Sequence, residues 1–185
     1  MKTLADSARN LSLDLGKLAD GMPGISPKFG SALSEAATVC FEEQRHYSGV
    51  AMQIDGDFDH SCKVNWNEPS TEQIKRAWAD PDETTEHGAY GVAALLVAGL
   101  TEYTVYERSR KGTGFDYWLG PKGAEDPLFQ DKARLEISGV RNGDDGVVSA
   151  RAAKKMKQTE RSDGALPAFI AIVEFGMPRS RVLKR

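Results

Sequence analysis

The sequence predicts a fold of the α/β (α+β) class, with a mixed central sheet flanked by helices. From residue 84 onward, the apolar periodicity changes in the order helix, three strands, helix, strand. The last of these strands, within 166–175, is apolar almost throughout (LPAFIAIVEF), which is typical of a strand buried on both faces. Because a helix precedes it, we expect this strand to be reached through a crossover helix.

Composition and length suit one globular domain, with or without an appended layer. The chain has 185 residues, of which 40% are hydrophobic and 28% charged. No apolar run reaches the roughly 18 to 20 residues that span a bilayer, and the N-terminal residues lack the apolar block of a secretory signal. Two cysteines, Cys40 and Cys62, imply no disulfide framework. We therefore expect a cytoplasmic protein.

The first 83 residues predict two segments before the core. Residues 1–27 carry leucines at loosely helical spacing and then a Gly- and Pro-rich stretch, which predicts an N-terminal helix and a linker. Residues 28–83 predict an extension that packs on the core, either as a unit of its own or as part of a single domain. Its expected elements are a helix over 31–46, a β-hairpin around DGDFD (55–59) and a short helix over 70–80.

The remaining residues, 84–185, predict the core itself. The stretch TTEHGAYGVAALLVAGL has a continuous apolar body, so it should form a buried helix. The elements expected after it are strands in YTVYERS, GFDYWLG and QDKARLEISGV, a basic helix in DDGVVSARAAKKMKQTE, and the apolar strand in LPAFIAIVEF.

The formal net charge of −3 hides an asymmetry along the chain. Residues 1–103 carry 8 basic and 16 acidic residues, whereas residues 104–185 carry 16 basic and 11 acidic ones. The positive charge is concentrated in three clusters, at 108–111, 151–157 and 179–185. Such clusters indicate either a phosphate-binding face or a solvated basic surface.

Two acids occur in neighbouring predicted strands. The period of two in a strand places Glu136 on one face with Lys132 and Ser138, and Asp116 precedes it by 20 residues in the strand before. If the two strands are adjacent, Asp116 and Glu136 can converge on one point. Carboxylate oxygens are the ligands of Mg²⁺ or Mn²⁺, which activate water for attack on a phosphodiester. The alternative is that the acids pair with arginines of the sheet, Arg108 or Arg134.

This arrangement resembles the PD-(D/E)XK nuclease superfamily, which includes restriction endonucleases and Holliday-junction resolvases, over roughly residues 84 to 176. The resemblance implies a restriction-endonuclease-like α-β-β-β-α-β core and three metal ligands. Glu86 in EHGAYGVAALL would match the acid of the first helix, Asp116 in GTGFDYWLG the acid of the second strand, and Glu136 in LEISG the acid of the (D/E)XK triplet.

One position departs from that pattern, because Ser138 stands where the triplet has its lysine. The family's lysine orients the attacking water and stabilises the developing charge, and serine can only form hydrogen bonds. Some members carry this lysine on the following helix or a nearby strand. The resemblance therefore leaves four substitutes open: Lys132, Lys154, Lys155 and Lys157.

The resemblance implies a metal-dependent phosphodiesterase or nuclease that acts on DNA or RNA with Mg²⁺ or Mn²⁺. Catalysis would involve Asp116, Glu136 and Ser138 with a lysine such as Lys132 or Lys155. The expected contacts to the nucleic-acid backbone are Arg108, Arg110, Lys111, Lys154 and Lys157. A homodimer would cut both strands of a duplex.

Ser138 also favours a different class of function, a nuclease-like fold without catalysis. Such a protein would bind nucleic acid or serve as an interaction subunit, with its acidic N-terminal half as the docking surface. A third alternative is an unrelated α/β domain whose carboxylates are structural. The whole chain also resembles short uncharacterised bacterial proteins that share TEHGAYG, RSRKGTGFDYWLG and ARLEISG-like stretches, a resemblance that implies no activity.

Overall fold

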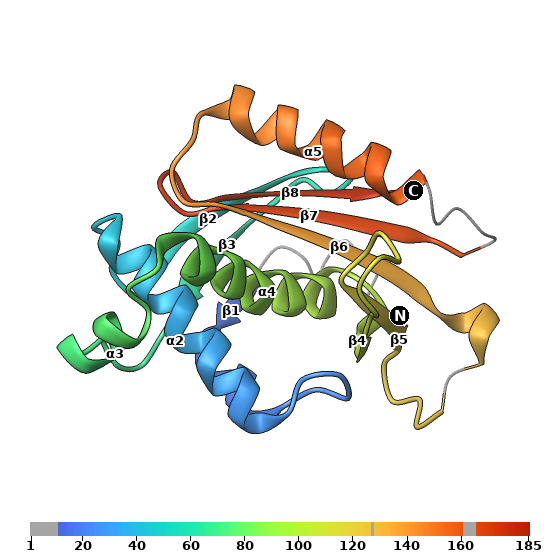
Figure 1. The fold of residues 1–185 in the computed structure, drawn as a ribbon, viewed down its shortest axis with the longest axis horizontal. Helices are drawn as coiled ribbons and strands as arrows, with labels where there is room; N and C mark the ends of the chain where they lie inside the picture. The colour runs from blue at the N-terminus through green and yellow to red at the C-terminus, as the bar shows by residue number, and fades with distance from the viewer. Residues whose placement is uncertain (1–10, 127, 161–165) are drawn as a thin grey trace.

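A computed structural model describes residues 11–126, 128–160 and 166–185. In these ranges the strands form one eight-stranded sheet in the order β1-β3-β2-β8-β7-β6-β5-β4 (Figure 1). The strands are β1 (Ser12–Asp14), β2 (Val50–Gly56), β3 (His60–Asn65), β4 (Tyr103–Arg108), β5 (Tyr117–Pro121), β6 (Ala133–Val140), β7 (Ala168–Glu174) and β8 (Arg179–Lys184). The helices are α2 (Pro27–Glu43), α3 (Glu72–Ala77), α4 (Pro81–Leu100) and α5 (Asp145–Thr159), with 3₁₀ turns η2 (Leu15–Asp20) and η3 (Phe129–Asp131).

The predicted α/β (α+β) class is confirmed, and the predicted order of elements from residue 84 is found. Helix α4 leads into β4, β5 and β6, which pair as antiparallel neighbours. Helix α5 then crosses over to β7, which pairs with β6 in parallel. Parallel neighbours need such a crossover, because a tight turn reverses the direction of the chain.

Helices cover both faces of the sheet (Figure 1). Helices α2 and α4 pack together on one face, and α5 packs on β6 and β7 from the other. Every residue of β7 is buried, which confirms the prediction from its apolar sequence. Alternate residues of this strand point to the two faces of the sheet. Ile170 and Ile172 pack under α5, and Phe169 and Ala171 belong to the larger core under α4.

The N-terminal segment differs from its prediction. The expected helix within 1–27 is a strand, β1, followed by the 3₁₀ turn η2, while Leu4 lies outside the described residues. Leu15 and Leu18 are fully buried in this turn, so the leucine spacing marked burial and not an α-helix. The boundary expected after residue 27 falls inside α2, which begins at Pro27 with Ser26 as its N-cap.

Most of the C-terminal basic cluster at 179–185 forms strand β8, which lies in the middle of the sheet. It pairs with β7 on one side and with β2 on the other, in the register Ile54↔Ser180. The predicted hairpin β2–β3 is therefore part of the same sheet as the core and not a separate layer packed on it. None of the helices in the described ranges is long and apolar enough to cross a membrane.

Helix α4 approaches β6 closely at Gly139. A Cβ atom at this position would lie 2.5 Å from the Thr85 carbonyl oxygen and 2.6 Å from Thr85 Cγ2. Glycine therefore sets the distance between the helix that carries Glu86 and the strand that carries Glu136.

We expect Gly139→Ala to lower the free energy of unfolding by about 1 to 3 kcal/mol, because the added methyl group overpacks this contact. Chemical denaturation would measure the change. Gly146→Ala is the matched control: that glycine is exposed in α5 and meets only the Asp144 side chain, at 3.2 Å. Equal stability of the two variants would contradict the prediction.

Candidate functional site

Asp116 lies at the entrance to β5, against the backbone of β6. The ladder between these strands runs through Tyr117↔Leu135 and ends there. The N–H of Asp116 donates to the Leu135 carbonyl at 2.8 Å, and Asp116 Oδ2 accepts from the N–H of Ile137 at 2.8 Å. Because strand N–H groups point along the plane of the sheet, this bond holds the carboxylate at the end of β5, within reach of both faces.

Glu136 is buried beneath α5, with 2% of its surface exposed. Its Oε1 forms an ion pair with Lys155 and accepts a hydrogen bond from Gln158 Nε2 at 3.1 Å. Both partners come from α5. Four lysines were predicted as possible substitutes for the lysine of the triplet, and among them Lys155 contacts Glu136.

The two carboxyl groups influence each other's ionisation. Burial and the neighbouring Asp116 carboxylate raise the pKa of Glu136 to about 7, although Lys155 opposes this. Burial also raises the pKa of Asp116, against the Ile137 N–H and the charges of Arg108 and Lys155. Two partly desolvated carboxyls that repel each other bind a cation readily, because the cation removes both penalties.

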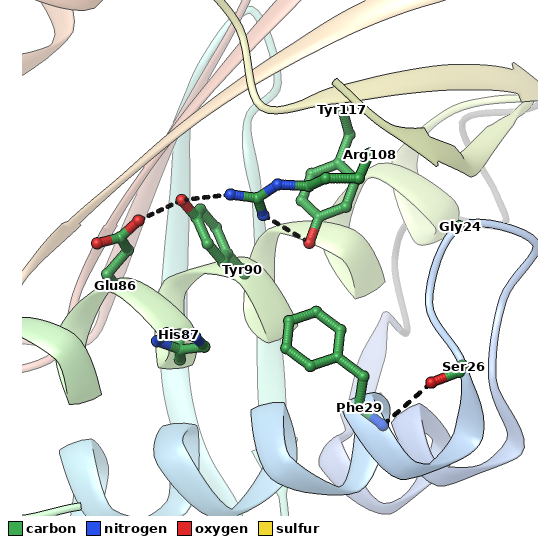
Figure 2. Close-up of a pocket in the computed structure, with 8 residues that line it drawn as sticks. All are labelled: Gly24, Ser26, Phe29, Glu86, His87, Tyr90, Arg108 and Tyr117. Carbon is green, nitrogen blue, oxygen red and sulfur yellow. Dashed lines mark hydrogen bonds between the residues drawn. The ribbon is translucent and has the colours of Figure 1, made fainter. Parts of the chain in front are cut away.

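Arg108 lies between Asp116 and α4, and Figure 2 shows its bonds to Tyr90 and Tyr117. Its guanidinium lies over the rings of Tyr90 and Tyr117, at 4.5 and 4.7 Å from their centroids, and donates to both hydroxyls. The Tyr90 hydroxyl in turn bonds to the Glu86 carboxylate and lies 3.3 Å from Asp116 Oδ1. Arg108 Nη2 is 4.0 Å from Asp116 Oδ1, so the predicted alternative of an Arg108 pair is present in the structure.

Glu86 is thus separated from Asp116 by the Tyr90 hydroxyl and does not join the carboxylate pair directly. Across the described ranges, no group of three or more His, Cys, Asp or Glu side chains could hold a metal ion. Asp116 and Glu136 still fit Mg²⁺ or Mn²⁺, because such ions are often bound by one or two carboxylates and take their other ligands from water and phosphate.

The pair lines a groove of about 1710 Å³ between the β4–β5 loop, the start of α4 and helix α5. All five residues predicted to contact nucleic acid line it. Its basic residues are Arg108, Arg110, Lys111, Arg141, Arg151, Lys154, Lys155 and Lys157. The clusters 108–111 and 151–157 therefore meet across one groove, although they are far apart in sequence.

Three other residues that the sequence singled out have partners other than the two acids. Lys132 lies with its ammonium 5.2 Å from the Tyr106 ring centroid and does not line the groove. Ser138 lines the groove, and its hydroxyl accepts from Arg151 Nη1 at 3.2 Å. Arg134, the other predicted partner for the acids, donates instead to the carbonyls of Thr159 and Leu166.

The third basic cluster also lies elsewhere. Arg179 and Arg181 pair with Asp55 and Asp145, and neither arginine lines the groove. The positive charge of β8 is therefore largely compensated within the fold.

Sequence reasoning missed Tyr90 and Gln158 as members of the site and named Arg151 only as part of the basic cluster 151–157. A signal existed for Tyr90 and Gln158. Tyr90 follows Glu86 by one helical turn, and Gln158 follows Lys155 by three residues on the face of α5 that also carries Ala152. Comparison with protein-family models, with curated proteins and with solved structures found no match.

The raised pKa of Glu136 predicts a pH-dependent stability. From about pH 4.5, the ordinary pKa of its side chain, to about pH 7, the folded protein binds a proton at Glu136 that the unfolded chain releases. The free energy of unfolding should therefore fall as pH rises through this window, by up to about 1.4 kcal/mol per pH unit.

Glu136→Gln should remove this slope, which denaturation at a series of pH values would measure. Glu68→Gln, at an exposed position after β3, is the matched control and should keep it. The prediction fails if wild type and Glu136→Gln have parallel pH profiles.

Proposed function

We propose that the protein is a metal-dependent phosphodiesterase that cleaves DNA or RNA at the Asp116–Glu136 pair. The observation that carries the proposal is the contact between Lys155 and Glu136. Ser138 stands where the nuclease pattern has a lysine beside its two acids, and Lys155 on α5 would take the place of that lysine. The set lies in a basic groove, as an enzyme for a polyanion requires.

The order of elements supports the resemblance to PD-(D/E)XK nucleases. Glu86 lies near the start of α4, Asp116 at the entrance to β5, and Glu136 in β6. After α5, strand β7 runs parallel to β6. These are the places that the resemblance assigns to Glu86, Asp116 and Glu136.

Each side chain has a distinct role in this proposal. Asp116 and Glu136 would hold Mg²⁺ or Mn²⁺, which supplies Lewis-acid activation of the phosphodiester and of water. Lys155, already directed at Glu136, would orient the attacking water and stabilise negative charge on the phosphate. Arg108, Arg110 and Lys111 would hold the backbone from one side of the groove, with Lys154 and Lys157 on the other.

The second candidate is a nuclease-like fold that binds nucleic acid without cleaving it. The observation in its favour is that Lys155 and Gln158 both engage Oε1 of Glu136, so a metal ion would compete with an existing ion pair. In this case the groove would still bind the backbone, and the acidic N-terminal half would dock a partner protein. A homodimer fits the enzyme better, since two sites are needed to cut a duplex.

Cleavage assays separate the two candidates. We expect labelled DNA or RNA to be cut with Mg²⁺ or Mn²⁺, and Asp116→Asn, Glu136→Gln and Lys155→Met each to lose at least about 100-fold in rate, because each removes a charge from the reacting centre. Lys132→Met is the matched control for Lys155→Met, since Lys132 lies outside the groove.

The outcomes point in different directions. Binding without cleavage under every metal condition would support the second candidate. Equal losses in Lys132→Met and Lys155→Met would remove Lys155 from its proposed role. No binding to DNA or RNA would contradict both candidates.

Metal binding should depend on pH in a defined direction. Because the pKa of Glu136 is raised to about 7, protons compete with the metal below that pH, and the affinity for Mn²⁺ should fall about tenfold per pH unit as Glu136 protonates. Titration of Mn²⁺ by electron paramagnetic resonance would measure the affinity, and calorimetry in buffers of different ionisation enthalpy would detect the released proton. A pH-independent affinity between pH 5.5 and 7 would show that Glu136 is not a ligand.

A further inference from the structure

We propose that a second cavity, beside the groove and beneath Arg108, holds one unpaired nucleobase of the bound strand. The inference rests on the proposed function for its ligand and adds a substrate class to it, namely nucleic acid with an unpaired nucleotide near the carboxylate pair. The cavity is lined by the 24–29 segment, by α4, and by Arg108 and Tyr117 (Figure 2).

The cavity has the size and the walls of a site for a flat ring. Its volume is about 430 Å³, within the range of about 300 to 1,000 Å³ that is usual for small-molecule pockets. Phe29, His87, Tyr90 and Tyr117 all line it, and Phe29 and His87 meet edge to face with ring centroids 6.2 Å apart. Tyr90 and Tyr117 are buried and lie against the Arg108 guanidinium, so the half-buried rings of Phe29 and His87 provide the surface on which a base can stack. Such stacking accepts any of the bases.

Polar groups in the walls complement the edge of a base. His87 Nδ1 lies 2.9 Å from the Glu83 carbonyl oxygen, which can only accept, so Nδ1 carries the proton and the neutral ring keeps Nε2 as an acceptor. The Glu86 carboxylate is a second acceptor at the rim, and the Arg108 guanidinium is a donor. Base edges present both donors and acceptors, and an unpaired base exposes its Watson–Crick edge.

The position of the cavity relative to the groove selects the ligand. Glu86, Tyr90 and Arg108 line both spaces, and Arg108 Nη2 lies 4.0 Å from Asp116 Oδ1. A phosphate held by Arg108 near the carboxylate pair would therefore have its own nucleoside at the mouth of the cavity. A base inside a stacked duplex cannot enter it, so the ligand is a single strand, a frayed end or a base turned out of the helix.

The wall opposite α4 is already in place. The N–H of Gly24 donates to the Val105 carbonyl at 3.1 Å, and a Cβ at Gly24 would lie 2.7 Å from backbone atoms of Tyr106 and Glu107. The segment before α2 thus lies directly against β4. A preformed cavity of this kind binds its ligand without first ordering its own walls.

The test combines a series of oligonucleotides that each lack one base with a protein variant at Phe29, which lines the cavity. Binding is measured without divalent cations, so that no cleavage occurs, on short single-stranded oligonucleotides that carry an abasic site at each position in turn. One position should weaken binding to the wild type by about tenfold, the low end of the contribution of a stacked base. Phe29→Leu keeps an apolar side chain of similar length but removes the ring. We expect this variant to bind the abasic and the intact oligonucleotide with equal affinity.

Phe129→Leu is the matched control, because Phe129 is exposed and lines neither space, and it should keep the wild-type penalty. A second readout needs no variant. Oligonucleotides with 5-iodouracil at the sensitive position, irradiated on the wild-type protein, should crosslink to Phe29, His87 or Tyr90, as mapped by mass spectrometry.

The outcomes distinguish this inference from the proposed function beneath it. If the oligonucleotides bind but no abasic position matters, or Phe29→Leu is weakened by the same abasic position as the wild type, the base site is wrong while the groove remains. The same conclusion follows if the crosslinks map only to groove residues outside the cavity, such as Phe115. If no oligonucleotide binds at all, the proposed function fails and this inference fails with it.

Discussion

The buried ion pair between Glu136 and Lys155 is the interaction on which the arrangement of the site depends. Glu136 is almost fully covered by α5, and an isolated carboxylate in that position would be strongly unfavourable. Lys155 and Gln158 offset part of this penalty, and the pKa of Glu136 remains raised to about 7. Such a pair adds little to stability, because desolvation of two charges cancels most of their attraction.

The geometry of that pair is set by apolar packing some distance away. Val148 and Ala152 of α5 pack on Ile170 and Ile172 of β7, which fixes the rotation of the helix over the sheet. Lys155 lies one helical turn after Ala152 and is therefore brought over the neighbouring strand, β6.

Asp116 combines a structural and an electrostatic task. Its carboxylate accepts the N–H of Ile137, a backbone donor beyond the end of the regular β5–β6 ladder. The same side chain is approached by Tyr90 from α4 and is influenced by Lys155 from α5. A strand-end acid held in the plane of the sheet can thus face groups on both sides, which a side chain in the middle of a strand cannot. An asparagine there keeps the acceptor for Ile137 while removing the charge.

Arg108 lines both the groove and the cavity beside it. Its guanidinium is held between two tyrosine rings and two hydroxyls, and the contacts of its flat, always charged group with the rings restrict its orientation. A lysine could not be fixed in the same way, since it lacks the planar group that stacks on both rings. The arginine is therefore well suited to position a phosphate between the carboxylate pair and the cavity.

The sequence by itself determined the fold class, the order of elements from residue 84, the buried strand β7 and the hairpin, because these depend on apolar periodicity and on turns, which are local. It also singled out Asp116, Glu136 and the basic clusters that line the groove. It missed β1 and β8, since whether a short or charged strand joins a sheet depends on the partner that covers it. Only the tertiary structure showed that Lys155, and not Lys132, contacts Glu136, that the Tyr90 hydroxyl lies between Glu86 and Asp116, and that Phe29 and Arg108 line one cavity. Those contacts join residues on different elements, and their geometry follows from how the helices pack on the sheet. Local sequence patterns do not predict that packing.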